Sequence, residues 1–110
     1  MKNDPTLRRW FLKYNKLLFD NKLPLNTICL WEPLGPAVGE TSVLVKDPFQ
    51  LIIKIDPCIM GMHRLAKLTI IHEMAHIKLW PLGDKEALHG KAWDEEIQRL
   101  TKFRCYRRML

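Results

Sequence analysis

Three residues in the middle of the chain have the types and spacing of a metal site. His72 and His76 are four residues apart, and Glu73 directly follows the first of them. On a helix, side chains four residues apart lie on one face, so both imidazoles can reach a single metal ion. Glu73 projects about a quarter-turn away, where it can hydrogen-bond a water on that ion without being a ligand. The H-E-x-x-H pattern therefore predicts a zinc site with Glu73 as the general base of a hydrolytic reaction.

An alternative interpretation is that two core histidines and a glutamate have this spacing by chance. With four histidines in 110 residues, the composition gives this pattern in about one of a hundred such chains. Residues 65–80 are also so apolar that three polar side chains would be costly to bury there, unless a metal or hydrogen-bond partners offset the lost water. We therefore prefer the metal-site hypothesis.

A third zinc ligand must come from another part of the chain. A hydrolytic zinc site usually takes three protein ligands and leaves a fourth position for water. We predict His89, which follows a loop after the central helix and directly precedes Gly90. His63 is unsuitable because nine residues of helix place it about 13 Å from His72. The other candidates are Asp84, Glu86, Asp94 and Cys58.

The first half of the chain predicts one helix followed by a small sheet. Asp4 and Pro5 signal a helix start, and apolar residues then recur at helical spacing over residues 5–20. The connections that follow are too short for a crossover helix, so we expect three strands with antiparallel neighbours. The β-prone runs that predict these strands are residues 27–31, 40–46 and 50–55.

The second half of the chain predicts the helix that carries the metal site. Residues 62–80 contain neither proline nor glycine and are apolar almost all round, which indicates a central helix buried on most sides. A last helix is expected from residue 90 to about residue 103. Together these elements predict an α+β fold: an N-terminal helix, a three-stranded, mainly antiparallel sheet, a central helix and a C-terminal helix. Residues 1–110 are expected to form a single domain.

Composition excludes several classes of protein. With 47% apolar and 27% charged residues, the chain has the composition of a folded globular protein. Charges near the N-terminus leave no room for a signal peptide, and charges within residues 65–80 exclude a bilayer span. Three widely spaced cysteines without a C-x-x-C pair indicate reduced thiols. We expect no membrane partner and an intracellular, cytoplasmic location: the host cytoplasm for a viral protein, with the nucleus as the alternative in a eukaryote.

The formal net charge of +6 favours anionic partners, and much of it is local. Residues 99–108 contain five basic residues and no acidic residue. This segment can contact the phosphates of DNA or can simply keep the protein in solution, and the sequence leaves both interpretations open. The residues predicted to contact nucleic acid are Arg99, Lys102, Arg104, Arg107 and Arg108.

Longer segments resemble the SprT-like metallopeptidase family, which includes the Spartan proteases that degrade proteins crosslinked to DNA. Residues 14–24 (YNKLLFDNKLP) are similar to the family's opening signature, and residues 68–76 (LTIIHEMAH) are similar to its active-site helix. His89 and Gly90, with Trp93 three positions later, resemble its third-ligand segment. The resemblance covers residues 7–103. It implies a zincin-like fold with one zinc ion, in a minimal peptidase core without the zinc ribbon that many members carry.

The leading hypothesis is a zinc-dependent endopeptidase that hydrolyses peptide bonds of protein substrates, with DNA-associated or DNA-crosslinked proteins as candidate substrates. A substrate strand can pair with a sheet edge, and residues 40–46 are a candidate for that edge. The alternative is a DNA- or partner-binding protein with a structural zinc site; Glu73 argues against it, because a structural site needs no general base. A third hypothesis, a deformylase-like hydrolase, depends on Cys58 as a zinc ligand.

Overall fold

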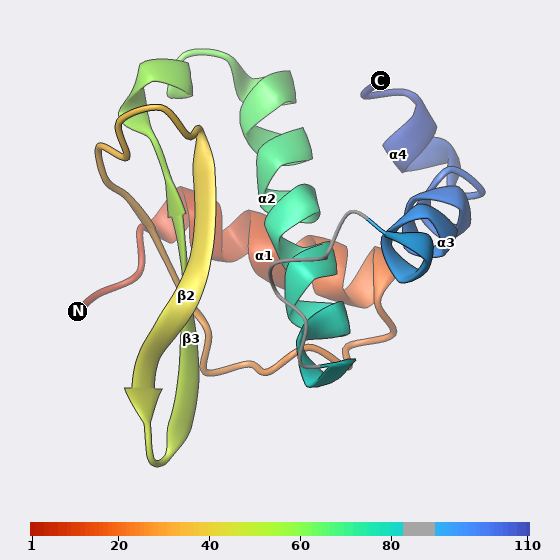
Figure 1. Ribbon diagram of the computed structural model, residues 1–110. Helices are drawn as coiled ribbons and strands as arrows, with labels where there is room; N and C mark the ends of the chain where they lie inside the picture. The colour runs from red at the N-terminus through yellow and green to blue at the C-terminus, as the bar shows by residue number, and fades with distance from the viewer. Residues whose placement is uncertain (83–89) are drawn as a thin grey trace.

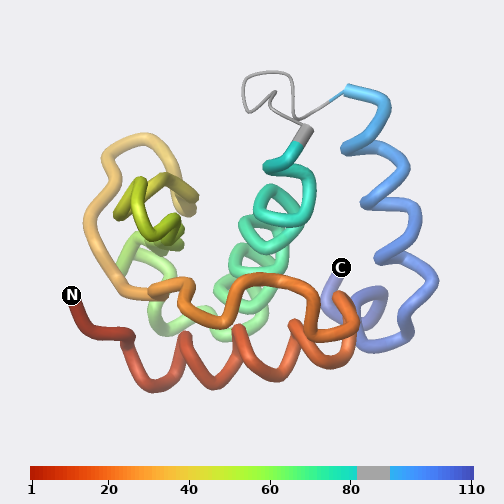
Figure 2. The backbone as a smooth tube through the Cα atoms, turned by 90° about the horizontal axis from the view of Figure 1, so that it is seen from below, coloured from red at the N-terminus to blue at the C-terminus, as the bar shows by residue number. Residues whose placement is uncertain are grey.

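The computed structural model of the chain describes residues 1–82 and 90–110. Within them, helix α2 (His63–Leu79) lies between a three-stranded sheet on one side and helices α3 (Lys91–Leu100) and α4 (Arg104–Arg107) on the other (Figure 1). Helix α1 (Pro5–Leu18) crosses behind the sheet and α2, and Figure 2 shows it passing from the side of the sheet, across α2, to the C-terminal helices. Helix α2 is therefore the central element, as the sequence predicts.

Helix α1 begins at the predicted residue and ends two residues before the predicted end. The Asp4 carboxylate accepts a hydrogen bond from the backbone N–H of Leu7 at 3.0 Å, and Pro5 is the first helical residue. The helix stops at Leu18 because Asp20 and Asn21 adopt positive φ values of 53° and 58°. The chain thus turns sharply toward the sheet.

The sheet is mixed, with the strand order β1-β3-β2. Strands β2 (Gly39–Lys46) and β3 (Phe49–Ile55) form an antiparallel hairpin, as predicted. The expectation of antiparallel neighbours is wrong for β1 (Ile28–Trp31), which pairs with β3 in parallel. The chain passes from β1 to the far edge before the hairpin returns β3 to the middle. Two reversals of direction make a parallel pair without a crossover helix.

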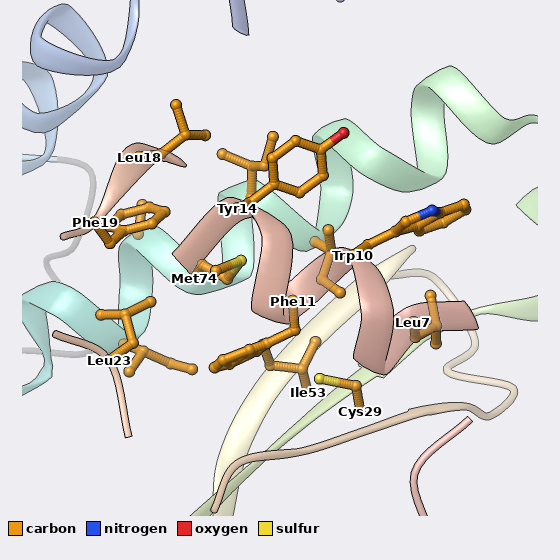
Figure 3. Close-up of a cluster of buried hydrophobic side chains, with 14 of the residues drawn as sticks. Leu7, Trp10, Phe11, Tyr14, Leu18, Phe19, Leu23, Cys29, Ile53 and Met74 are labelled. Atoms are coloured by element: carbon orange, nitrogen blue, oxygen red, sulfur yellow. The ribbon is translucent and has the colours of Figure 1, made fainter. Parts of the chain in front are cut away.

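The hydrophobic core lies where α1, α2 and the sheet meet. Figure 3 shows Phe11 of α1, Met74 of α2 and Ile53 of β3 in one cluster, and each of these side chains is fully buried. The remaining elements agree with the predicted ones except at the C-terminus, where the expected single helix is interrupted after Leu100 and continues as the short α4. No helix in the described residues is long and apolar enough to cross a membrane.

Candidate metal centre

Helix α2 brings the three residues of the H-E-x-x-H pattern together. The possible ligand atoms of His72, Glu73 and His76 all lie within 4.8 Å of one another. The Nε2 atoms of the two histidines are 3.1 Å apart. Two nitrogens bound to one tetrahedral zinc ion at about 2.0–2.1 Å are separated by about 3.3 Å, so this pair fits a shared zinc ion. The donor set therefore suits the metal that the sequence predicts.

Glu73 is buried and accepts a hydrogen bond from a residue of the sheet. Only 5% of the surface of Glu73 is exposed, and the Thr41 hydroxyl donates a hydrogen bond to Glu73 Oε1 at 2.7 Å. Thr41 is itself buried on β2, 32 positions away in the sequence. The sequence does not predict a role for Thr41, because a threonine in a strand gives no sign of the helix residue it contacts. The structure thus adds a side chain that fixes the rotation of the Glu73 carboxylate.

Gly39 allows β2 to come this close to α2. A Cβ atom at this position would lie 2.7 Å from Cγ2 of Thr69 and 3.0 Å from Oε2 of Glu73. The first of these distances is shorter than real Cβ contacts allow, so a side chain here would push the strand away from the helix. The absence of a side chain at Gly39 is therefore what permits the bond between Thr41 and Glu73.

Trp93 of α3 packs on both imidazoles. Its ring stacks on His76, with centroids 4.4 Å apart and an angle of 22° between the planes. It meets the ring of His72 edge-on, with centroids 4.8 Å apart and an angle of 63°. Contacts of this kind restrict the orientation of the imidazole rings. The position of α3 therefore bears directly on the geometry of the histidine pair.

A buried carboxylate connects α3 to α2. Glu96 is 4% exposed and accepts hydrogen bonds from Lys78 of α2 at 2.6 Å and from Arg99 at 2.7 and 2.8 Å. Burial raises the pKa of the Glu96 carboxyl, but the bonds from Arg99 and Lys78 lower it by more, so its pKa lies below the ordinary value. The guanidinium of Arg99 also lies over the rings of Phe19 and Phe103. Arg99, which the sequence assigned to nucleic acid, is thus engaged in these internal contacts.

Of the other predicted ligands, Asp94 and Cys58 lie in the described residues, and the structure does not bring them to the histidines. Within residues 1–82 and 90–110, His72, Glu73 and His76 form the only group of three or more side chains that could hold a metal ion, so Asp94 and Cys58 belong to no such group. A hydrogen bond to Asp56 raises the pKa of the Cys58 thiol, which disfavours the thiolate that a zinc ligand needs. His89, Asp84 and Glu86 lie outside the described residues.

A cavity of about 290 Å³ opens beside the histidine and the glutamate. Val38, which precedes β2, and Gly39, its first residue, line one side, and Leu65, Leu68 and Thr69 of α2 line another. His72 and Glu73 also line it. An apolar side chain that enters this cavity would therefore lie next to the candidate metal site.

The fold and the site define an α+β protein that carries an H-E-x-x-H helix. The family model described as the SprT-like family matches residues 7–108, which is nearly the whole chain. The chain belongs to the SprT-like family, which confirms the resemblance seen in the sequence. Searches of curated proteins and of solved structures give no significant match.

The contacts of Glu96 predict a pH-dependent contribution to stability. In Glu96→Gln, the charged hydrogen bonds to Lys78 and Arg99 are lost, and we expect the free energy of unfolding at neutral pH to fall by about 1–3 kcal/mol. Because the folded-state pKa of Glu96 is lowered, its contribution is present above about pH 4.3, the ordinary pKa of a glutamate, and is lost as the pH falls through the folded-state value. Urea unfolding at several pH values measures both effects.

The matched control is Glu95→Gln, which removes the same charge from an exposed neighbouring position. We expect it to change the free energy of unfolding by less than about 0.5 kcal/mol. Equal effects of the two substitutions would show that the contacts of Glu96 do not stabilise the packing of α3 on α2.

Proposed function

We propose that this chain is a zinc-dependent endopeptidase that hydrolyses peptide bonds of protein substrates. The observation that carries the proposal is the buried carboxylate of Glu73, held by Thr41 within 4.8 Å of the two imidazole donors. A binding protein with a structural zinc site has no use for a positioned base at this point. Membership of the SprT-like family supports the same interpretation.

The proposed roles follow from the positions of the side chains and, for His89, from the sequence. His72 and His76 would hold the zinc ion through Nε2, and His89 is proposed as the third ligand, four residues before Trp93 in the sequence. Zinc would polarise a substrate carbonyl and acidify a water molecule. Glu73 would accept the proton of the attacking water and deliver it to the leaving amine. Thr41 is a positioning residue in this scheme, because its hydroxyl holds one carboxylate oxygen of Glu73.

The surroundings of Glu73 suggest how a peptide would bind. Strand β2 is at the edge of the sheet, and its first residue, Gly39, lies against Glu73. An extended substrate can add to such an edge through backbone hydrogen bonds. One apolar side chain of the substrate would then enter the cavity formed by Val38, Leu65 and Leu68. This arrangement favours unfolded or extended segments as substrates. DNA-associated proteins are the more specific class of substrate that we propose.

The direct test is cleavage of a denatured protein by the zinc-loaded chain and by Glu73→Gln. The substitution keeps the shape of the side chain and removes its basicity, so we expect zinc stoichiometry to be unchanged and the cleavage rate to fall by about 10²–10⁴-fold. Wild-type protein that carries zinc but cleaves no denatured or DNA-bound protein, or that is matched by Glu73→Gln, would contradict the proposal. The alternative of a binding protein with structural zinc would then be favoured.

The positioning role of Thr41 predicts a change in kcat that depends on its hydroxyl group. Thr41→Val keeps the volume of the side chain and removes the hydroxyl that bonds to Glu73. We expect kcat to fall by about 10-fold with little change in KM, which corresponds to about 1.4 kcal/mol of transition-state stabilisation. Thr41→Ser retains the hydroxyl and is expected to restore most of kcat. If valine and serine at this position reduce kcat equally, the threonine acts through packing and not through its hydrogen bond.

A further inference from the structure

A second hollow, lined mainly by basic residues, lies away from the candidate metal centre. It has a volume of about 540 Å³ and is formed by α1, α2, α4 and the two residues that follow α4. Five of the eight residues that line it are basic, and the others are Tyr14, Cys105 and Met109. We call it the basic pocket, and its charged members are Lys13, Arg64, Lys67, Arg104 and Arg108.

The structure sorts the basic C-terminal segment into two groups. Arg104 and Arg108 are four residues apart, so they share one face of the final turn and line the pocket. Lys102 and Arg107 are also exposed but are not among the residues that line it. The remaining cations of the pocket come from α1 and α2, which are distant in the sequence. The linear run of charge is therefore part of a site made by three helices.

Contacts within the pocket hold the three helices in this arrangement. Arg64 donates hydrogen bonds to the main-chain oxygens of Met109, at 2.5 Å, and Leu110, which attaches this segment to the start of α2. The ammonium of Lys67 lies 5.4 Å from the centre of the Trp10 ring, and that of Lys13 lies 5.5 Å from the centre of the Tyr14 ring. The side chains of Arg64, Lys67 and Lys13 are thus placed by contacts with main-chain oxygens and aromatic rings.

Acidic side chains do not neutralise this charge in the part of the chain that the structure describes. The ion pairs there are made by the cations Lys54, Lys78 and Arg99, and none involves a residue of the basic pocket. Like charges brought together without counter-charges repel one another, and an anion that enters between them relieves this repulsion. The pocket therefore has the electrostatics of an anion site.

We infer that the basic pocket binds phosphate groups. The planar guanidinium of arginine matches the geometry of phosphate oxygens, and lysine adds point charges of the same sign. The charged side chains are exposed or half-exposed around an open hollow, so both a small polyphosphate and the backbone of a nucleic acid can reach them. The shared chemistry is the phosphate group. The inference does not depend on the proposed peptidase activity.

The test compares two pairs of substitutions in the same segment. Arg104→Ala with Arg108→Ala removes two charges that line the pocket, and Lys102→Ala with Arg107→Ala removes two charges that do not. The probes are inorganic pyrophosphate, measured by calorimetry, and a labelled single-stranded oligonucleotide, measured by fluorescence anisotropy. We expect the first pair to weaken binding by at least about 10-fold and the second by about twofold or less.

A third pair of substitutions tests whether the three helices act together. Lys13→Ala with Lys67→Ala changes only α1 and α2, and we expect a loss of binding comparable to that of the α4 pair. If the oligonucleotide is the ligand, each pocket pair should also reduce the slope of log K against log salt by about 1.4. All these side chains are exposed or half-exposed, and thermal unfolding by circular dichroism confirms that the variants are folded.

Each outcome has a defined meaning. Binding of pyrophosphate, or of the oligonucleotide, that is lost in both pocket pairs and kept in the control pair supports the inference, and the probe that binds identifies the source of the phosphate. Equal weakening by the pocket and control pairs would overturn it in favour of diffuse attraction to the basic surface. Absence of binding to either probe at low ionic strength would also overturn it.

Discussion

The close approach of β2 to α2 at Glu73 is the constraint on which the rest of the site depends. A carboxylate in a buried position loses its contact with water and needs a hydrogen-bond donor from the protein. Thr41 is one such donor, and it reaches Glu73 because Gly39 has no side chain to separate strand from helix. The buried core between α1, α2 and the sheet keeps both elements in place. The stability of the fold and the geometry of the candidate base therefore have a common origin.

The opposite side of α2 supplies the second constraint. Trp93 packs on the rings of both histidines, and the ion pair between Glu96 and Lys78 of α2 holds the helix that carries this tryptophan. The sheet thus holds Glu73 through a hydrogen bond, and α3 packs against the two imidazoles. The two sides meet at the H-E-x-x-H turn, where a small change in either would alter the position of the donors. A chain of 110 residues can in this way position a candidate metal site with few elements.

Local features of the sequence predicted most of the elements to within one or two residues. The Asp4 cap and the apolar spacing locate α1, and the apolar run without glycine or proline locates α2. The spacing of His72 and His76 needs only helical geometry, so the pairing of their Nε2 atoms also follows from the sequence. These features depend on neighbours within about one turn of helix.

Features that depend on distant contacts could not be predicted in this way. The parallel pairing of β1 with β3 arises because the strand after Trp31 lies at the opposite edge of the sheet, and no local sequence pattern specifies that position. The hydrogen bond from Thr41 to Glu73 also links residues that are distant in the sequence. The same is true of Lys13 and Arg104, which line the basic pocket together. The basic run predicts a nucleic-acid contact for Arg99, and only the structure shows that Arg99 bonds to Glu96. The role of His89 stays a prediction, since it lies outside the described residues.

The central claim is that two imidazoles of α2 hold one zinc ion beside a carboxylate that is not a ligand. X-ray absorption at the zinc edge of the zinc-loaded chain tests it most directly. The account predicts three nitrogen neighbours and one oxygen at about 2.0–2.1 Å, with one nitrogen fewer in His89→Ala and no change in Glu73→Gln. A sulfur neighbour at about 2.3 Å, or a shell of four protein ligands without a water position, would contradict the account.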